Sequence, residues 1–305
     1  TEEQIDYSLL ENRAANVGAL FRDRVAKTPD AIAYWYPEGD GYAKVSWKQV
    51  KDTVYALGAG LIDLGVGEEE RVAIASGTRY EWVIADLADM VSGAVTTTIY
   101  PTTIADDVAF ILSDSDTKVV FAEDNAQVEK LRSIRDVIPN VAKVVVFDGE
   151  GDGDWVITME DLEVRGRARM ESEPGVVDAR IDNIAPERLA TIIYTSGTTG
   201  RPKGVRLLHK TWTYQGAAIQ ATDILGPDDL QYLWLPLAHV FGKQLLTIPL
   251  QIGFPTVVDG RIDKIVDNLA VVKPTFMGAA PRIFEKAYGR IKLMMDAESG
   301  AKAKI

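Results

Sequence analysis

The order of secondary-structure signals repeats in this chain of 305 residues, and the repeat limits the folds that the chain can adopt. A segment at about 71–147 alternates β-rich and helix-like runs as strand, helix, strand, helix and strand. A later segment, at about 189–286, contains the same order between 232 and 278. Because a helical crossover joins parallel strands, each segment predicts a mainly parallel sheet. The expected fold class is α/β, with two similar parallel-rich sheets and flanking helices.

Local signals mark the elements around these repeats. Apolar residues at helical spacing predict a helix that starts at Val17 and ends before Pro29. Ser46, with Gln49 three residues later, has the pattern of a capping box and predicts the start of another helix. Helices are also expected at 127–138 and 261–271, and a last strand at 275–278.

Composition excludes several kinds of site and partner. The chain has no cysteine and only two histidines, which excludes disulfides, thiolate metal sites, a cysteine nucleophile and histidine-rich metal sites. A net charge of -12 argues against nucleic acid as a main partner. No apolar run approaches the roughly 18 residues of a transmembrane segment, and the N-terminus lacks a signal-peptide pattern. We expect a cytoplasmic protein, and the sequence indicates no oligomeric state.

The strongest functional signal lies between Leu189 and Lys210. An apolar run with strand composition ends there in a loop of hydroxyl-bearing residues and glycines, and a lysine follows the loop. Successive backbone amides and hydroxyls in such a loop can converge on a phosphate group. The loop and its lysine are Thr195, Ser196, Gly197, Thr198, Thr199, Gly200 and Lys203.

The charge around this loop is opposite to that of the whole chain. Between Glu187 and Asp223 there is no acidic residue, whereas five residues are basic, which indicates a polyanionic ligand. The alternative is a surface hairpin loop, because turns are rich in the same residue types. A Walker-type ATPase is disfavoured, since the spacing does not fit a Walker A loop. The basic residues are Arg188, Arg201, Lys203, Arg206 and Lys210.

Over its full length this segment resembles the signature loop of the adenylate-forming, or AMP-binding, superfamily of acyl-CoA synthetases, adenylation domains of peptide synthetases and luciferases. The motifs at Leu235 to Phe241 and Ala280 to Lys286 resemble the long-chain fatty acyl-CoA synthetase branch. The resemblance extends from about Val17 to Lys286. It implies the N-terminal adenylation domain of that fold, with two α/β sheets, which agrees with the repeated order of elements.

The resemblance also implies roles for the loop residues. Thr195 to Gly200 are expected to hold the β- and γ-phosphates of ATP, and Lys203 to neutralise them as a catalytic cation. The loop then stabilises departing pyrophosphate by position and charge, without a protein nucleophile. Thr195 is the expected contact to Mg²⁺.

A second expected site is the turn that follows the strand at 232–235. His239 lies after the carboxyl end of a parallel strand, where α/β folds open their ligand crevices. From the residues alone, a histidine beside Val240 and Phe241 is more often a core or capping residue. The resemblance implies instead that His239, with Val240, Phe241 and Gly242, positions the carboxylate substrate and gates its pocket. A fatty acid is already ionised at about pH 7, so no general base is required.

The resemblance therefore implies a long-chain fatty acid–CoA ligase. In the reaction that the resemblance implies, a fatty acid and MgATP give acyl-AMP and pyrophosphate, and CoA then displaces AMP. The expected cofactors and partners are small molecules: ATP, Mg²⁺, CoA and the fatty acid. Two alternatives stay open, an adenylating enzyme that loads an acyl group onto a carrier protein and a non-catalytic nucleotide- or acyl-binding module.

Part of the superfamily's motif set does not occur in these 305 residues. The Tyr-Gly-x-Thr-Glu motif, whose Glu helps to bind Mg²⁺, is not found, because Tyr288-Gly289 continues with Arg290. The aspartate that contacts ribose and the lysine of the mobile C-terminal domain are also missing. We therefore expect 1–305 to be an N-terminal fragment without its lid domain, which binds ATP weakly and turns over poorly. Pyrophosphate exchange tests this expectation, and turnover typical of the superfamily would contradict it.

Overall fold

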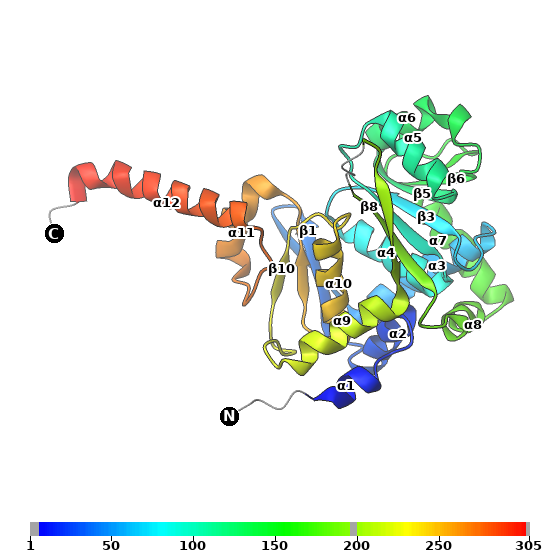
Figure 1. Cartoon of the computed structure of the whole chain (residues 1–305), viewed down its shortest axis with the longest axis horizontal. Helices are drawn as coiled ribbons and strands as arrows, with labels where there is room; N and C mark the ends of the chain where they lie inside the picture. The colour runs from blue at the N-terminus through cyan, green and yellow to red at the C-terminus, as the bar shows by residue number, and fades with distance from the viewer. Residues whose placement is uncertain (1–5, 196–199, 303–305) are drawn as a thin grey trace.

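The computed structural model describes residues 6–195 and 200–302, and the side chains of these residues except 286, 287, 290 and 296–302. The larger of its two sheets has seven strands (Figure 1). Every neighbouring pair in this sheet is parallel except the last, β8 with β9. In spatial order the strands are β7 (Val156–Thr158), β6 (Lys143–Asp148), β5 (Thr117–Asp124), β3 (Arg71–Ala75), β4 (Val95–Ile99), β8 (Leu189–Thr195) and β9 (Lys203–Leu208).

The smaller sheet has four strands, which come from two distant parts of the chain. The first three in spatial order are parallel, and the fourth forms an antiparallel hairpin with the third. They are β10 (Gln231–Leu233), β11 (Thr256–Val258), β1 (Ile32–Glu38) and β2 (Gly41–Ser46).

The strand pairing differs in part from the grouping expected from the sequence. The segment 189–208, which the repeat placed with the second unit, extends the larger sheet, because β8 pairs with β4. The N-terminal hairpin of β1 and β2 in turn completes the smaller sheet. The strand expected at 275–278 is reduced to a single bridge between Gln231 and Phe276. The expected class, an α/β fold with two sheets and flanking helices, is confirmed.

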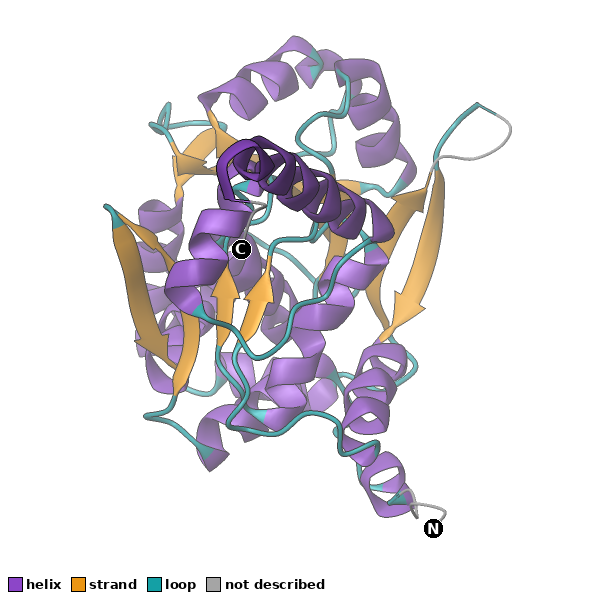
Figure 2. Cartoon of the chain, turned by 90° about the vertical axis from the view of Figure 1, so that its left-hand side faces the viewer, coloured by secondary structure: helices purple, strands orange, loops and turns teal. Residues whose placement is uncertain are grey.

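Helices cover the faces of both sheets, and α12 extends away from them, toward the viewer in Figure 2. One apolar core joins α2, α3, α4 and α10 to both sheets, and a second lies under α5 and α6 on the other face of the larger sheet. The helices are α1 (Tyr7–Glu11), α2 (Val17–Lys27), α3 (Trp47–Asp63), α4 (Tyr80–Ser92), α5 (Ala105–Asp114), α6 (Asn125–Ser133), α7 (Met159–Ser172), α8 (Val176–Asn183), α9 (His209–Ala221), α10 (Val240–Ile252), α11 (Ile265–Val272) and α12 (Pro281–Lys302).

Capping side chains set several helix starts. The predicted capping box of α3 is confirmed: the Gln49 N–H donates to Ser46 Oγ at 3.3 Å, and the Ser46 N–H donates to Gln49 Oε1 at 2.8 Å. Helix α10 begins at Val240 because His239 Nδ1 accepts the Phe241 N–H at 3.2 Å. The helices expected at 127–138 and 261–271 are shorter, since a 3₁₀ turn forms the end of the first and the start of the second.

A buried ion pair connects α4 to α10. Lys243 Nζ lies 2.7 Å from both carboxylate oxygens of Asp86, and the two side chains are only 2% and 5% exposed. The Thr96 hydroxyl on β4 lies 2.7 Å from Asp86 and 2.9 Å from Asp89. Burial, followed by the charge of Asp86, raises the pKa of Asp89 well above its ordinary value. A protonated Asp89 can donate to Thr96, which then donates to Asp86.

His209, at the first position of α9, is buried and neutral. Its Nδ1 accepts the backbone N–H of Val17 at 3.2 Å, which ties α9 to α2. Burial, and then the positive charge of Lys243, lower the pKa of His209 from 6.5 to about 3. The folded protein therefore excludes a proton that the unfolded chain takes up.

Replacing His209 by glutamine should flatten the fall of stability in acid. The unfolded imidazole binds a proton below about pH 6.5, whereas the folded one stays neutral down to about pH 3. The neutral histidine thus contributes stability that is complete above pH 6.5 and is lost as the pH falls. Between about pH 6.5 and 4.5, the unsubstituted protein should lose roughly 2 kcal/mol more unfolding free energy than His209→Gln, measured with urea. Parallel pH curves for the two proteins would contradict this.

Candidate functional site

A cavity of about 630 Å³ lies at the carboxyl ends of β4 and β8, between the β8–β9 hairpin and the start of α10. Carboxyl ends of parallel strands are where α/β folds open ligand crevices. Three of the predicted site residues line this cavity: Thr195 from β8, and His239 and Val240 from the turn before α10. Two stretches that are 40 or more residues apart in the sequence therefore line one cavity.

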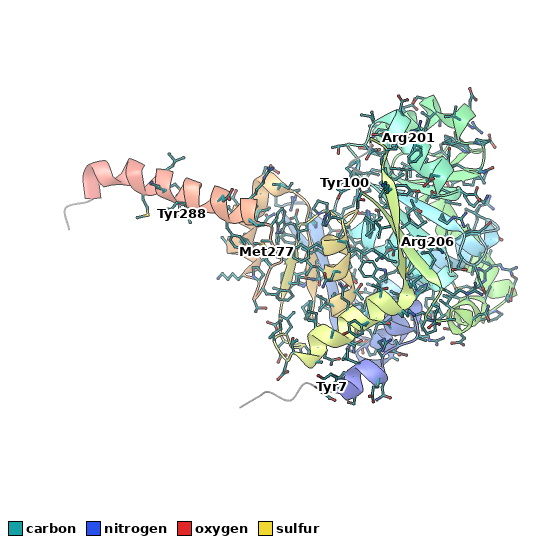
Figure 3. All side chains as sticks on the ribbon, in the orientation of Figure 1. Tyr7, Tyr100, Arg201, Arg206, Met277 and Tyr288 are labelled. Carbon is teal, nitrogen blue, oxygen red and sulfur yellow. The ribbon has the colours of Figure 1, made fainter. Side chains whose placement is uncertain are left out.

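Strand alternation places Lys203 on the cavity side of the β8–β9 hairpin. Lys203 is the Cα partner of Thr195, and Val205 is the partner of Ile193. Because directly paired residues share a face, these four side chains form one row, and Thr195, Ile193 and Val205 line the cavity. Lys203 continues the row at the loop end of the hairpin, where it is exposed. Arg206, labelled on the same hairpin in Figure 3, lies on the opposite face.

The hydroxyl-rich loop itself is described only at its ends. Ser196, Gly197, Thr198 and Thr199 lie outside the described residues, and Gly200 has a positive φ of 100°. Gly204, directly after Lys203, packs against the hairpin: a Cβ at this position would lie 2.9 Å from Ile192 Cγ2. The Pro-Lys-Gly motif therefore has a structural reason for its glycine.

Two of the five basic residues in the window between Glu187 and Asp223 form ion pairs with carboxylates. Arg201 lies over the ring of Phe110, with 5.1 Å between the guanidinium carbon and the ring centroid. Within the described part of the chain, no carboxylate lies in ion-pair distance of Arg201, Lys203 or Arg206. The positive charges of the window that form no ion pair among the described residues are therefore those of Arg201, just before β9, and of Lys203 and Arg206 on β9. The paired residues of the window are Arg188 with Glu69 at 2.7 Å and Lys210 with Glu187 at 3.6 Å.

His239 caps α10 and lines the cavity at the same time. Because its Nδ1 accepts the Phe241 N–H, the neutral imidazole carries its proton on Nε2 and can donate from there. A hydrogen bond to β4 fixes the preceding residue, Ala238: the Thr98 hydroxyl donates to the Ala238 carbonyl at 3.0 Å. Capping, one of the two roles that the residue type allows, is confirmed. The geometry also leaves His239 suited to hold an anionic group.

Phe241 and Gly242 do not line the cavity. The Phe241 ring lies beside Gly278, because a Cβ there would be 3.4 Å from Phe241 Cζ. Gly242 is buried, and a Cβ at this position would lie 2.1 Å from the Pro236 carbonyl oxygen. Gly242 therefore allows the turn to fold back tightly on itself.

Five hydroxyl-bearing residues of the cavity wall were not predicted as site residues, and one of them is Tyr194 on β8. The other four come from β4 and the segment after it, and Tyr100 is labelled near the hairpin in Figure 3. The available signal is a run rich in threonine, 96–103, at the end of a buried strand. These four residues are Thr98, Tyr100, Thr102 and Thr103.

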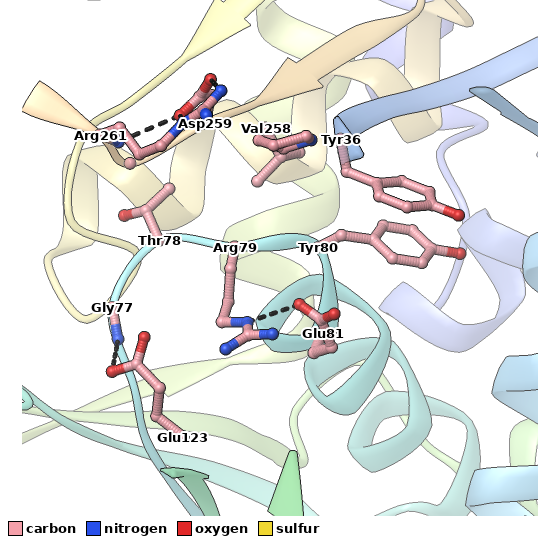
Figure 4. A pocket seen from close by; sticks show the side chains of 12 residues that line it. Tyr36, Gly77, Thr78, Arg79, Tyr80, Glu81, Glu123, Val258, Asp259 and Arg261 are labelled. Carbon is pink, nitrogen blue, oxygen red and sulfur yellow. Dashed lines mark hydrogen bonds and ion pairs between the residues drawn. The ribbon is translucent and has the colours of Figure 1, made fainter. Parts of the chain in front are cut away.

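A second cavity, of about 400 Å³, lies between the loops that follow β3 and β11 (Figure 4). Its guanidinium groups are already paired, Arg79 with Glu81 and Arg261 with Asp259, each at 2.6 Å. Glu123 adds a third carboxylate to the lining. Because carboxylates outnumber cations here, this cavity suits a polyanion less well than the one at the hairpin.

The described residues contain no group of three or more acidic or histidine side chains that could hold a metal ion. Thr195 offers one exposed oxygen at the end of β8. Mg²⁺ commonly takes one or two protein oxygens and completes its shell with waters and substrate phosphates, so a single threonine fits an ion that arrives with ATP.

Across 6–195 and 200–302, no helix has the length and hydropathy needed to cross a membrane.

The fold is that of the N-terminal domain of acyl-CoA ligases. The N-terminal domain of FACL13 from Mycobacterium tuberculosis superposes with a TM-score of 0.74 at 25% identity, over 89% of this chain and 64% of that one. A putative long-chain-fatty-acid CoA ligase from Rhodopseudomonas palustris superposes with a TM-score of 0.73 at 22% identity, over 89% of this chain and 64% of that one.

The chain belongs to the family of AMP-binding enzymes, whose model matches residues 21–304. The long-chain-fatty-acid–CoA ligase FadD15 of Mycobacterium tuberculosis is 31% identical over 292 residues, which are 95% of this chain and 47% of that protein. Long-chain-fatty-acid–CoA ligase 1 of Cavia porcellus is 30% identical over 275 residues, 82% of this chain and 37% of that protein. The chain thus spans at most about half the length of these relatives, and the resemblance seen in the sequence is confirmed.

Adding a methyl group at Gly242 should destabilise the protein. The new Cβ would meet backbone oxygen at 2.1 Å, so the turn before α10 must shift, at a cost of roughly 1–3 kcal/mol in unfolding free energy. Gly289→Ala is the matched control, because that helical glycine in α12 has open space around it and alanine favours helix. Urea unfolding compares the two variants. Equal stability of Gly242→Ala and the unsubstituted protein would contradict the tight turn.

Proposed function

We propose that the protein to which this chain belongs activates a long-chain fatty acid with ATP and transfers the acyl group to CoA. Family membership and relatives with the name long-chain-fatty-acid–CoA ligase support an adenylate-forming ligase. The observation that carries the proposal is the shared cavity of Thr195 and His239, because activation requires phosphate and carboxylate to meet. A cytoplasmic location is part of the proposal.

In the first step, an oxygen of the fatty acid carboxylate attacks the α-phosphorus of ATP. The oxygen–phosphorus bond forms as the bond from the α-phosphorus to the bridging oxygen breaks, and pyrophosphate leaves with the electron pair. We assign phosphate binding to Thr195, Ser196, Gly197, Thr198, Thr199 and Gly200. Lys203, on the cavity side of the hairpin, would offset the charge that grows on pyrophosphate. Mg²⁺, when bound with ATP, supplies further charge compensation.

His239 would position the carboxylate by donating from Nε2, since Nδ1 is already engaged with the backbone. Val240 lies beside it on the cavity wall, and Phe241 and Gly242 support the turn from behind. No proton has to be removed, because the acid is ionised at about pH 7. His239 therefore acts by position, which brings the reacting atoms into line.

In the second step, the thiol sulfur of CoA attacks the acyl carbon, the bond to the AMP oxygen breaks, and the thiol proton is released. A carrier protein with a phosphopantetheine thiol could accept the acyl group by the same chemistry. Assays that offer CoA and a phosphopantetheinyl carrier side by side distinguish the two acceptors. CoA is favoured over a carrier protein by the names of the relatives, which are long-chain-fatty-acid–CoA ligases.

Lys203→Met in the complete protein should reduce pyrophosphate exchange about 100-fold, because one cation that stabilises the transition state is removed. Arg206→Met is the matched control: it removes a cation three residues along the same strand, on the face away from the cavity. We expect the control to retain exchange within about threefold.

Three outcomes separate the possible functions. Loss of exchange in Lys203→Met alone supports the ligase. Equal losses in both variants would contradict a specific role for Lys203 and indicate a general effect of charge. ATP binding that weakens in Lys203→Met, in a protein without any exchange activity, would instead establish the non-catalytic binding module.

A further inference from the structure

The turn that carries His239 is fixed from both sides by one strand, β4. Before the histidine, the Thr98 hydroxyl donates to the Ala238 carbonyl at 3.0 Å. After it, Lys243 is one helical turn along α10, and its N–H donates to the His239 carbonyl at 3.0 Å. The Lys243 side chain is bound by Asp86, and Asp86 lies 2.7 Å from the Thr96 hydroxyl of the same strand.

Thr96 and Thr98 are two residues apart, so both project from one face of β4. β4 also pairs with β8, where Thr98 is the Cα partner of Ile193, two residues before Thr195. The strand therefore contacts both walls of the cavity. The distance from the phosphate loop to His239 depends on how α10 is held against this strand.

We propose that the buried Asp86–Lys243 pair is a positioning device that fixes His239 relative to the phosphate-binding hairpin. Neither residue lines the cavity, and both side chains are almost fully buried. The pair acts through the first turn of α10. Its effect on turnover rests on the function proposed above, whereas its effect on the turn itself does not.

The geometry of the pair favours this role over simple stabilisation. Replacement of a buried ion pair by apolar residues of similar size is often neutral or stabilising, so stability alone gives little reason for one here. Both oxygens of Asp86 bind Nζ at 2.7 Å, which fixes direction as well as distance. Thr96 and the Trp212 ring, 5.2 Å from Nζ, enclose the pair on other sides.

The test is the double variant Asp86→Leu with Lys243→Met, which removes the directed pair and leaves no buried charge unpaired. Its urea-unfolding free energy should stay close to that of the unsubstituted protein. Amide hydrogen exchange at Phe241 and Lys243 should become at least about tenfold faster, because both amides bind His239. In the complete enzyme, kcat for adenylate formation should fall about tenfold while KM for ATP stays within about twofold.

Two further variants keep the test decisive. Thr247→Val is the control on α10, since that buried hydroxyl bonds only to the Lys243 carbonyl of its own helix in the described structure, and it should leave exchange at Phe241 unchanged. If the double variant does not fold, Asp86→Asn takes its place, because the amide keeps the shape and one acceptor oxygen. We expect it to accelerate exchange at the same two amides.

Exchange rates at Phe241 and Lys243 equal to those of the Thr247→Val control would overturn the positioning role. Faster exchange with kcat unchanged would support the fixing of the turn and overturn its contribution to catalysis. An unsubstituted protein without pyrophosphate exchange would refute the proposed function, and the amide measurements would then decide the positioning role by themselves.

Discussion

An ion pair between α4 and α10, removed almost completely from water, joins the two helices close to the site. Taking Asp86 and Lys243 out of solvent is costly, and only close geometry with further hydrogen bonds offsets the cost. The structure supplies both, through two short contacts to Nζ and one to the Thr96 hydroxyl. Burial, followed by the charge of Asp86, raises the pKa of Asp89, which favours the neutral form of this second buried carboxyl.

From this constraint the site follows in a few steps. α10 lies against β4, and its first turn places His239 at the carboxyl end of a parallel strand. β8 lies on the other side of β4 and ends in the hydroxyl-rich loop. The cavity thus forms where two neighbouring strands stop, which is the general place for ligands in α/β folds. The family match gives this arrangement its chemical context.

Local patterns predicted much of the fold. The capping box at Ser46 and the helix from Val17 depend on neighbours within a few residues, so the sequence reveals them directly. The membership of the two sheets was harder to predict, because β8 pairs with β4 across about 95 residues and periodicity does not encode partners. The strand expected around Phe276 forms only one bridge, to Gln231 of the edge strand β10, and the local composition does not reveal how far such pairing extends.

The site, like the fold, was predictable where local motifs mark it and unpredictable where it depends on residues far apart in the sequence. The loop pattern predicted Thr195 and Lys203, and the family resemblance implied His239. The structure brings Thr195 and His239 into one cavity. Asp86 and Lys243 escaped notice because a lysine in a helix is usually exposed and its partner is 157 residues away. Two aspartates within the apolar run of α4 were the only hint.

The antiparallel register of β8 and β9 has a consequence for how such chains can diverge. Insertions that only lengthen the loop between the two strands keep Lys203 opposite Thr195. A slip of one position in the pairing would exchange the two faces, turn the lysine toward Ile192 and Tyr194, and present a glycine to the cavity. The register of the two strands therefore decides which face of the hairpin carries the lysine.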